Sequence, residues 1–272
     1  MNGVADLIVI PARFGSTRLP GKPLVQIAGR TLLERVIDVA QRAARLAGDI
    51  DVVVATDDVR IGVHARGVGC EAVLTAPDIS SGSGRACAAA QMRAARPAHV
   101  VNLQGDAPFI TPSMVADPID LLRASSADVV TPVVRLDWKA LDEMRQHKRM
   151  APSSGTTCIR SADGRALWFS KAIIPAIRDE TALRAAGPLS PIFRHLGLYA
   201  YRFEALERYE RAPPSSYEKL EGLEQLRLLE LGADIRTVEV RPAVHEMSGI
   251  DTLEDVTLAE ALIARFGDPM TR

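Results

Sequence analysis

A loop near the N-terminus combines cations, hydroxyls and glycine. It spans residues 11–24 and reads P-A-R-F-G-S-T-R-L-P-G-K-P-L. A glycine-containing loop that leaves a buried strand can direct backbone N–H groups and cations at a polyphosphate. The pattern is neither a P-loop nor the dinucleotide turn G-x-G-x-x-G. We therefore predict a polyphosphate site of another kind, the alternative being a solvated basic turn. The cations and hydroxyls of the loop are Arg13, Arg18, Lys22, Ser16 and Thr17.

Two carboxylates stand at predicted element ends. Asp106 follows the apolar run 100–103, and Asp251 precedes a helix predicted over 253–266. Open α/β sheets bind ligands at the carboxyl ends of their strands. Carboxylates placed there suit a hard cation such as Mg²⁺, which keeps some waters and bridges phosphate oxygens. The alternative for Asp251 is a helix cap.

Alternating strand and helix signals must position these residues in the first half of the chain. Short apolar runs predict buried parallel strands, and apolar residues at helical spacing predict helices between them. Such alternation favours a parallel sheet covered by helices on both faces. The predicted strands are 7–10, 52–55, 72–74 and 100–103. The predicted helices are one that begins at residue 32 and stops at Gly48, and two more over 86–95 and 114–123.

The pattern changes after residue 134. A strand is predicted over 129–134, and two β-rich runs flank a turn with Asp163 and Gly164, which is typical of a hairpin. We therefore predict an α/β half over 1–134, an antiparallel insertion over 135–194, and completion of the α/β domain over 195–272. The remaining predicted elements are a strand over 198–201, a helix over 218–231, a strand over 235–240 and a helix over 253–266.

Composition limits the partners. The chain has 272 residues, with 33 Lys and Arg against 34 Asp and Glu, and a net charge of −1. No global field attracts nucleic acid or a membrane, so neither partner is expected. No apolar run reaches membrane-spanning length. The three cysteines are widely spaced, which favours neither a disulfide framework nor a zinc site. We expect a cytoplasmic protein.

The loop and seven further motifs together resemble one family. The chain is similar to the 3-deoxy-manno-octulosonate (KDO) cytidylyltransferases over nearly its whole length. Each short piece alone would be weak, but the set and its order are specific. The further motifs are A-T-D-D at 55–58, S-G-S-G-R at 81–85, V-N-L-Q-G-D-A-P at 101–108, F-S-K-A-I-I-P at 169–175, R-H-L-G-L-Y at 194–199, L-E-Q-L-R at 223–227 and G-I-D-T-L-E-D at 249–255.

The resemblance implies a fold and an activity. The fold is a Rossmann-like α/β domain with a smaller insertion that helps to form a homodimer. The activity is Mg²⁺-dependent transfer of CMP from CTP to an acidic acceptor, with release of pyrophosphate. Lys22, Arg13 and Asp106 would be catalytic, and Asp106 and Asp251 would hold the metal. The nucleotide would be bound by Ala12, Arg13, Ser16, Lys22, Thr56, Asp57, Asp58, Ser81, Gly82 and Gln104, and the acceptor by Arg85, Lys171, His195, Tyr199, Glu224 and Gln225.

Several residues depart from the family pattern. Gly84 stands for the usual Asp, Ala107 for the usual Glu and Lys171 for the usual Arg, and residues 151–157 replace a D-P-N-x-V-K-V stretch. Lysine does not give the bidentate carboxylate recognition of arginine. The acceptor is therefore less defined than the nucleotide. KDO or a related sugar acid is the first expectation, and a small phosphonate such as phosphonoformate is the alternative. More remote are a uridylyl- or guanylyltransferase and an inactive nucleotide-binding regulator.

Overall fold

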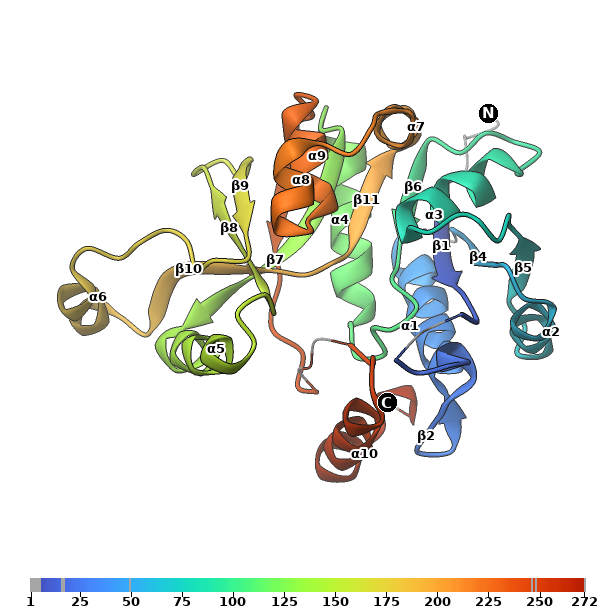
Figure 1. Ribbon diagram of the computed structural model, residues 1–272, viewed down its shortest axis with the longest axis horizontal. Helices are drawn as coiled ribbons and strands as arrows, with labels where there is room; N and C mark the ends of the chain where they lie inside the picture. The colour runs from blue at the N-terminus through green and yellow to red at the C-terminus, as the bar shows by residue number, and fades with distance from the viewer. Residues whose placement is uncertain (1–5, 16–17, 49, 246, 248, 272) are drawn as a thin grey trace.

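The computed structural model describes residues 6–15, 18–48, 50–245, 247 and 249–271. Within this part of the chain, one mixed sheet of ten strands crosses the molecule (Figure 1). The strand order is β5-β4-β1-β6-β11-β7-β10-β8-β9, and β12 pairs with β7. The strands are β1 (Leu7–Ala12), β4 (Asp51–Thr56), β5 (Glu71–Leu74), β6 (His99–Asn102), β7 (Val129–Asp137), β8 (Thr156–Arg160), β9 (Ala166–Ser170), β10 (Leu189–His195), β11 (Tyr199–Arg202) and β12 (Ile235–Glu239).

The predicted parallel sheet is confirmed in the first half of the chain. Strands β5, β4, β1 and β6 run parallel to one another. Strands β11, β10, β8 and β9 pair antiparallel, whereas β12 joins β7 parallel. A small separate hairpin follows the N-terminal loop, with strands β2 (Gln26–Ile27) and β3 (Arg30–Thr31).

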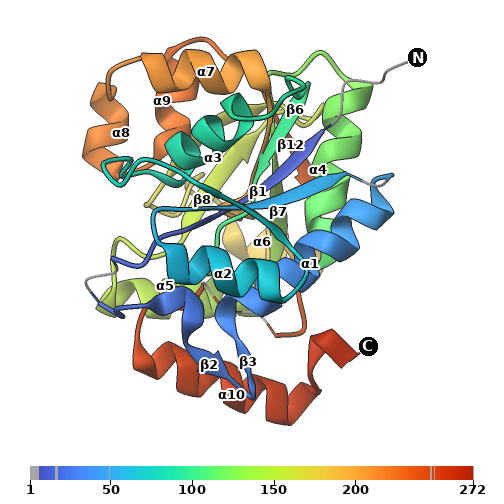
Figure 2. The ribbon, with the colours of Figure 1, turned by 90° about the vertical axis from the view of Figure 1, so that its right-hand side faces the viewer.

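Helices cover both faces of the sheet (Figure 2). Strand β1 shows why, because its side chains alternate between two apolar clusters. Ile8 and Ile10 pack with residues of α1, α4 and α10, while Leu7 and Val9 pack with residues of α3, α7 and α9. The helices are α1 (Leu32–Leu46), α2 (Val59–Gly67), α3 (Gly82–Gln91), α4 (Pro112–Ala124), α5 (Trp138–Met150), α6 (Glu180–Ala186), α7 (Phe203–Arg211), α8 (Ser216–Glu221), α9 (Glu224–Glu230) and α10 (Leu253–Phe266), with 3₁₀ turns at Lys22–Leu24 and Pro269–Thr271.

The helices predicted over 218–231 and 86–95 differ most from the structure. The single helix predicted over 218–231 is wrong, because Gly222 lies in the left-handed region at φ 63° and ends α8 before α9 begins. Helix α3 begins at Gly82 rather than at residue 86. The hydroxyl of Ser81 accepts a hydrogen bond from the backbone N–H of Gly84, and this cap offsets the poor helix propensity of the two glycines.

The insertion extends the main sheet. Strand β7 continues to Asp137, so the boundary predicted at residue 134 falls inside a strand. The insertion strand β10 pairs with the second half of β7, and β8 and β9 follow it outwards. The predicted hairpin is confirmed, since β8 and β9 pair antiparallel around the turn with Asp163 and Gly164.

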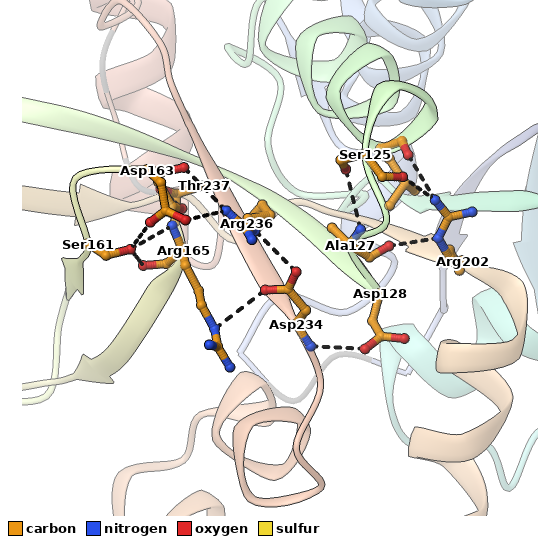
Figure 3. A network of polar contacts seen from close by, with 12 residues as sticks. Ser125, Ala127, Asp128, Ser161, Asp163, Arg165, Arg202, Asp234, Arg236 and Thr237 are labelled. Carbon is orange, nitrogen blue, oxygen red and sulfur yellow. Dashed lines mark hydrogen bonds and ion pairs between the residues drawn. The ribbon is translucent and has the colours of Figure 1, made fainter.

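A network of polar contacts fixes this hairpin turn to the rest of the domain (Figure 3). Arg236 of β12 donates hydrogen bonds to Asp163 at 2.8 Å and to Asp234 at 3.1 Å. The Thr237 hydroxyl donates to the carbonyl oxygen of Gly164 at 2.9 Å. The backbone N–H of Asp234 donates to Asp128, just before β7, at 2.9 Å. The turn is therefore tied to the start of both β7 and β12.

No helix in the described part of the chain has the length and apolar character needed to cross a bilayer.

Candidate active site

A cavity of about 290 Å³ opens where β1 and β6 end and α3 begins. This is the edge at which parallel α/β sheets bind their ligands. The structure brings together six of the ten residues predicted to bind the nucleotide, and both predicted metal ligands. The cavity is lined by Pro11, Ala12, Arg13, Arg18, Lys22, Pro23, Ser80, Ser81, Gly82, Arg85, Gln104, Gly105, Asp106 and Asp251.

An ammonium group joins two carboxylates at the floor of this cavity. Lys22 Nζ lies 2.9 Å from Asp106 Oδ2 and 3.0 Å from Asp251 Oδ1. Arg18 adds a guanidinium 3.1 Å from Asp251 Oδ2. A cation thus already sits between the two carboxylates, and their spacing fits a shared positive charge. Among the described residues no group of three or more His, Cys, Asp or Glu could hold a metal, so a metal here would take further ligands from phosphate and water.

The backbone fixes these carboxylates relative to each other. Asp106 and Asp251 are 145 positions apart in the chain. The backbone N–H of Ile250 donates to the carbonyl oxygen of Asp106 at 2.9 Å and joins the two loops. The helix-cap alternative for Asp251 is wrong, since Thr252 is the N-cap of α10 and forms a capping box with Asp255. The carboxylate of Asp251 is therefore directed to Lys22 and Arg18.

Gly105 permits the close approach of the two loops that form the cavity. A Cβ at this position would stand 2.5 Å from the carbonyl oxygen of Pro11, a backbone atom at the end of β1. We expect Gly105→Ala to lower the free energy of unfolding by about 1–3 kcal/mol through overpacking, and to lower nucleotide binding with it. Urea unfolding and calorimetric titration with CTP measure both effects.

Gly67→Ala is the matched control, because a Cβ at Gly67, at the end of α2, meets nothing within 4 Å. An equal effect of the two substitutions would contradict the assigned contact with Pro11.

The first turn of α3 forms one wall of the cavity. Ser81 caps the helix, and Gly82 packs closely on Gln104, because a Cβ at Gly82 would lie 3.2 Å from Gln104 Oε1. Backbone N–H groups at a helix N-terminus attract anions. This wall therefore adds N–H donors to the cations of the N-terminal loop.

Four predicted nucleotide residues are not among those lining the cavity. Ser16 lies outside the described residues. Thr56 is fully buried, and Asp58 caps α2. Asp57 accepts a hydrogen bond from the backbone N–H of Phe14 at 3.4 Å and so helps to hold the N-terminal loop in place. The nucleotide-binding roles of these residues remain predictions.

The guanidinium of Arg85, predicted to bind the acceptor, is already hydrogen-bonded to other protein groups. Its side chain is 3% exposed, and it donates to the Ile79 carbonyl oxygen at 2.9 Å, to Asp57 at 3.2 Å and to the Thr75 hydroxyl. It lines the cavity with this guanidinium already bonded. Its geometry is that of a group that shapes the loop after β5.

The other predicted acceptor residues do not line the described cavity. The Tyr199 hydroxyl donates to Gln225 Oε1 at 2.9 Å. Glu224 Oε2 accepts from the Ser83 hydroxyl at 2.6 Å, and Ser83 follows Gly82, which lines the cavity. These contacts place the predicted acceptor residues of α9 directly against the first turn of α3.

His195 is buried and neutral. Burial, with the nearby charge of Lys171 as a smaller cause, lowers the pKa of His195 to about 3. Its Nε2 lies 2.8 Å from the Thr131 hydroxyl, which lies 2.7 Å from the Leu198 carbonyl oxygen. A hydroxyl has one proton to donate. Since the carbonyl accepts it, we infer that His195 Nε2 donates to Thr131.

Lys171 lies on a segment clamped from two sides. Its backbone N–H donates to Glu221 Oε2 at 2.6 Å, and its carbonyl oxygen accepts from Lys148 Nζ at 2.5 Å. Burial lowers the pKa of the Lys171 ammonium. Sequence reasoning missed Lys148, Glu221 and Ser83, because no motif marks contacts between residues so distant in the chain. Arg18 was named as a loop cation without a role, and its charge was the available signal.

Fold and site together define an enzyme of nucleotidyl transfer. A family model described as Cytidylyltransferase matches residues 7–235. The chain belongs to the cytidylyltransferase family, and the resemblance seen in the sequence to its KDO-specific members is confirmed.

Relatives match over nearly the full chain. The 3-deoxy-manno-octulosonate cytidylyltransferase of Maricaulis maris is 40% identical over 96% of this chain and 98% of its own length. That of Anaeromyxobacter dehalogenans is 41% identical over 94% and 97%. A solved CMP:2-keto-3-deoxy-manno-octonic acid synthetase complexed with CTP superposes with a TM-score of 0.81 at 34% identity, over 96% of this chain and 99% of that one.

Proposed function

We propose that the protein transfers CMP from CTP to KDO and releases pyrophosphate. The observation that carries the proposal is the placement of both Asp106 and Asp251 within hydrogen-bond distance of Lys22 at the end of the sheet. The relatives named above support CTP and KDO as the substrates. In this reaction the anomeric hydroxyl oxygen bonds to the α-phosphorus, the bond to pyrophosphate breaks, and the hydroxyl loses its proton.

The residues of the cavity supply the charge that this transfer needs. Nucleotidyl transfer depends mainly on in-line positioning and on neutralising phosphate charge. Arg13, Lys22 and the N–H groups at the start of α3 would hold the triphosphate. Asp106 and Asp251 would hold Mg²⁺, which when bound neutralises charge on the phosphate oxygens. Arg18, which already contacts Asp251, lines the same cavity.

The acceptor is a sugar acid in this proposal. The relatives that match over nearly the whole chain carry the KDO-specific name, whereas the phosphonate alternative receives no support from them. An inactive regulator is disfavoured, because Lys22, Asp106 and Asp251 meet in one place despite the substituted Gly84 and Ala107.

One experiment tests nucleotide and acceptor together. We expect pyrophosphate release with CTP and KDO in the presence of Mg²⁺, and a CMP–KDO conjugate visible by phosphorus NMR. UTP and GTP should support at most a small fraction of this rate. A phosphonate–phosphate anhydride formed from phosphonoformate, without CMP–KDO, would contradict the proposed acceptor. Equal turnover with UTP would contradict the proposed nucleotide.

We further propose that the enzyme is a cytoplasmic homodimer formed through the insertion. The support is a group of exposed apolar side chains on and beside the insertion, together with the outer strand β9. Leu167 on β9 is 52% exposed, Leu220 on the neighbouring α8 80%, and Met150 at the end of α5 88%. Light scattering on the purified chain gives the oligomeric state.

A further inference from the structure

Buried polar atoms without a hydrogen-bond partner gather around the first turn of α3. In the part of the chain that the structure describes, they include Asn102 Oδ1, Gln225 Nε2 and Glu210 Oε1. Asn102 Nδ2 donates to the Ser83 hydroxyl at 3.2 Å, and that hydroxyl donates to Glu224, the neighbour of Gln225. Buried polar atoms in proteins are nearly always paired. A group of unpaired acceptors and donors next to the nucleotide cavity therefore points to a polar ligand.

Gly84 makes room for the carboxylate of Glu210. Glu210 stands at the end of α7, the helix that packs on α3. A Cβ at position 84 would lie 2.9 Å from Glu210 Oε2 and 2.8 Å from Ser81 Oγ. Cβ atoms do not approach oxygen atoms that closely. A side chain at residue 84 would therefore push the Glu210 carboxylate away from its observed position at the start of α3.

The environment of Glu210 is poor in stabilising partners. Burial and, as a smaller cause, the charge of Glu224 raise the pKa of this carboxyl to about 6. Glu218 also raises it, whereas Arg227 lowers it, and the thiol of Cys87 lies within its field. Two neighbouring carboxylates accept hydrogen bonds from hydroxyls and repel a further anionic group. A positive charge is available at Lys171, which lies close enough to act on His195.

We propose that Glu210 is a specificity-determining residue that accepts a hydrogen bond from a hydroxyl of the CMP acceptor. The ligand class is a polyhydroxylated carboxylic acid, with its hydroxyls toward Glu210 and Glu224 and its carboxylate toward Lys171. This inference rests on the proposed function and adds to it the recognition of the acceptor's hydroxyl groups. Gly84 contributes by leaving space for the Glu210 carboxylate at the start of α3.

Glu210→Gln tests the proposal, because it keeps the size of the side chain and removes its charge. We expect the KM for KDO to rise about tenfold or more, the scale of a hydrogen bond to a charged group, with little change in the KM for CTP. Glu204→Gln on the same helix is the matched control, since the Glu204 side chain is 75% exposed. It should leave both constants unchanged.

The pH dependence separates recognition from a structural role. A hydroxyl donor favours the ionised carboxylate, so bound KDO should lower the pKa of Glu210 from its value of about 6 in the free enzyme. Binding then releases a proton, and the KM for KDO should fall as pH rises from about 5 to about 7 and level off above. In Glu210→Gln this dependence should disappear. A carboxylate that merely stabilised α3 would change the melting temperature and leave this profile unchanged.

Gly84→Ala provides a second variant. Its methyl group should displace the Glu210 carboxylate and raise the KM for KDO like Glu210→Gln, whereas any rise in the KM for CTP is assigned to its contact with Ser81 Oγ. If Glu210→Gln behaves like Glu204→Gln while the parent enzyme forms CMP–KDO, the inference is overturned and the proposed function stands. If the parent enzyme transfers CMP only to an acceptor without hydroxyls, both are overturned.

Discussion

The single variants Asp106→Asn and Asp251→Asn should each lower turnover by about a hundredfold or more. Loss of residues that merely support metal ligands already costs about 10- to 100-fold, and both carboxylates lie within 3.0 Å of the same ammonium. Asparagine keeps the shape of the side chain, so the loss of turnover measures the effect of removing the negative charge. Initial rates of pyrophosphate release measure it, with thermal melting as the check on folding.

The double variant is the more informative measurement. If Asp106 and Asp251 act on one cation, removing the second carboxylate costs little once the first is gone. We expect the double variant to lose far less than the product of the two single losses. Independent, multiplicative losses would rule out a shared site, even if each single variant were inactive.

Asp6→Asn is a matched control for the loss of a paired carboxylate. Asp6 is buried and bonds to His99 at 2.8 Å and Arg123 at 2.7 Å, at the start of β1 and so at the opposite end of the strand. Its pKa is lowered, with the hydrogen bonds and charges of His99 and Arg123 outweighing the opposing effect of burial. It therefore stabilises the fold above its unfolded pKa of about 3.8, and its replacement should lower the melting temperature with little change in turnover.

The parts of the fold that depend on local pattern could be predicted from the sequence. Strand β1 is an unbroken apolar run, and α10 was predicted with its observed bounds of Leu253–Phe266, because its capping residues stand directly before an apolar repeat. The helix predicted over 218–231 failed at Gly222, whose left-handed conformation ends α8. A glycine inside a helical pattern does not reveal its φ angle in advance.

The residues of the site also fall into those that could be predicted from the sequence and those that could not. The loop residues Arg13 and Lys22 stand together in the chain, so their joint role could be predicted. The contact of Glu210 with Gly84 could not, because it joins two helices packed across 126 positions of sequence. Gly84 is recognisable in the sequence as a departure from the family's usual Asp. Its effect on Glu210 becomes visible only when the packing of α7 against α3 is known.

Lys22→Met should have two opposite effects, slower turnover and tighter metal binding. In the structure Lys22 Nζ lies between Asp106 and Asp251, where a divalent cation would sit. The lysine and the metal therefore compete for the same carboxylates while no nucleotide is bound. When the triphosphate is present, its oxygens offer Lys22 another partner, and a cation opposite the phosphate charge that grows during the reaction favours the transition state.

The two effects have different sizes and different measurements. Turnover should fall about a hundredfold or more, on the scale of other lost electrostatic contacts to a transition state. Affinity for Mn²⁺ in the absence of nucleotide should rise about threefold to tenfold. The metal then no longer has to displace the partly exposed ion pairs of Lys22 with Asp106 and Asp251. Electron paramagnetic resonance of free Mn²⁺ gives the second quantity without any turnover.

Arg18→Met is the comparison that isolates the position of Lys22. Arg18 contacts Asp251 at 3.1 Å but not Asp106, and its side chain is 65% exposed. Its removal should raise Mn²⁺ affinity less and reduce turnover less. If Lys22→Met left Mn²⁺ affinity unchanged or lowered it, the lysine and the metal would not share a site. If it left turnover near normal in a folded protein, Lys22 would have no part in the transfer, and the positive charge on the triphosphate would have to come from Arg13 and Arg18 on the same loop.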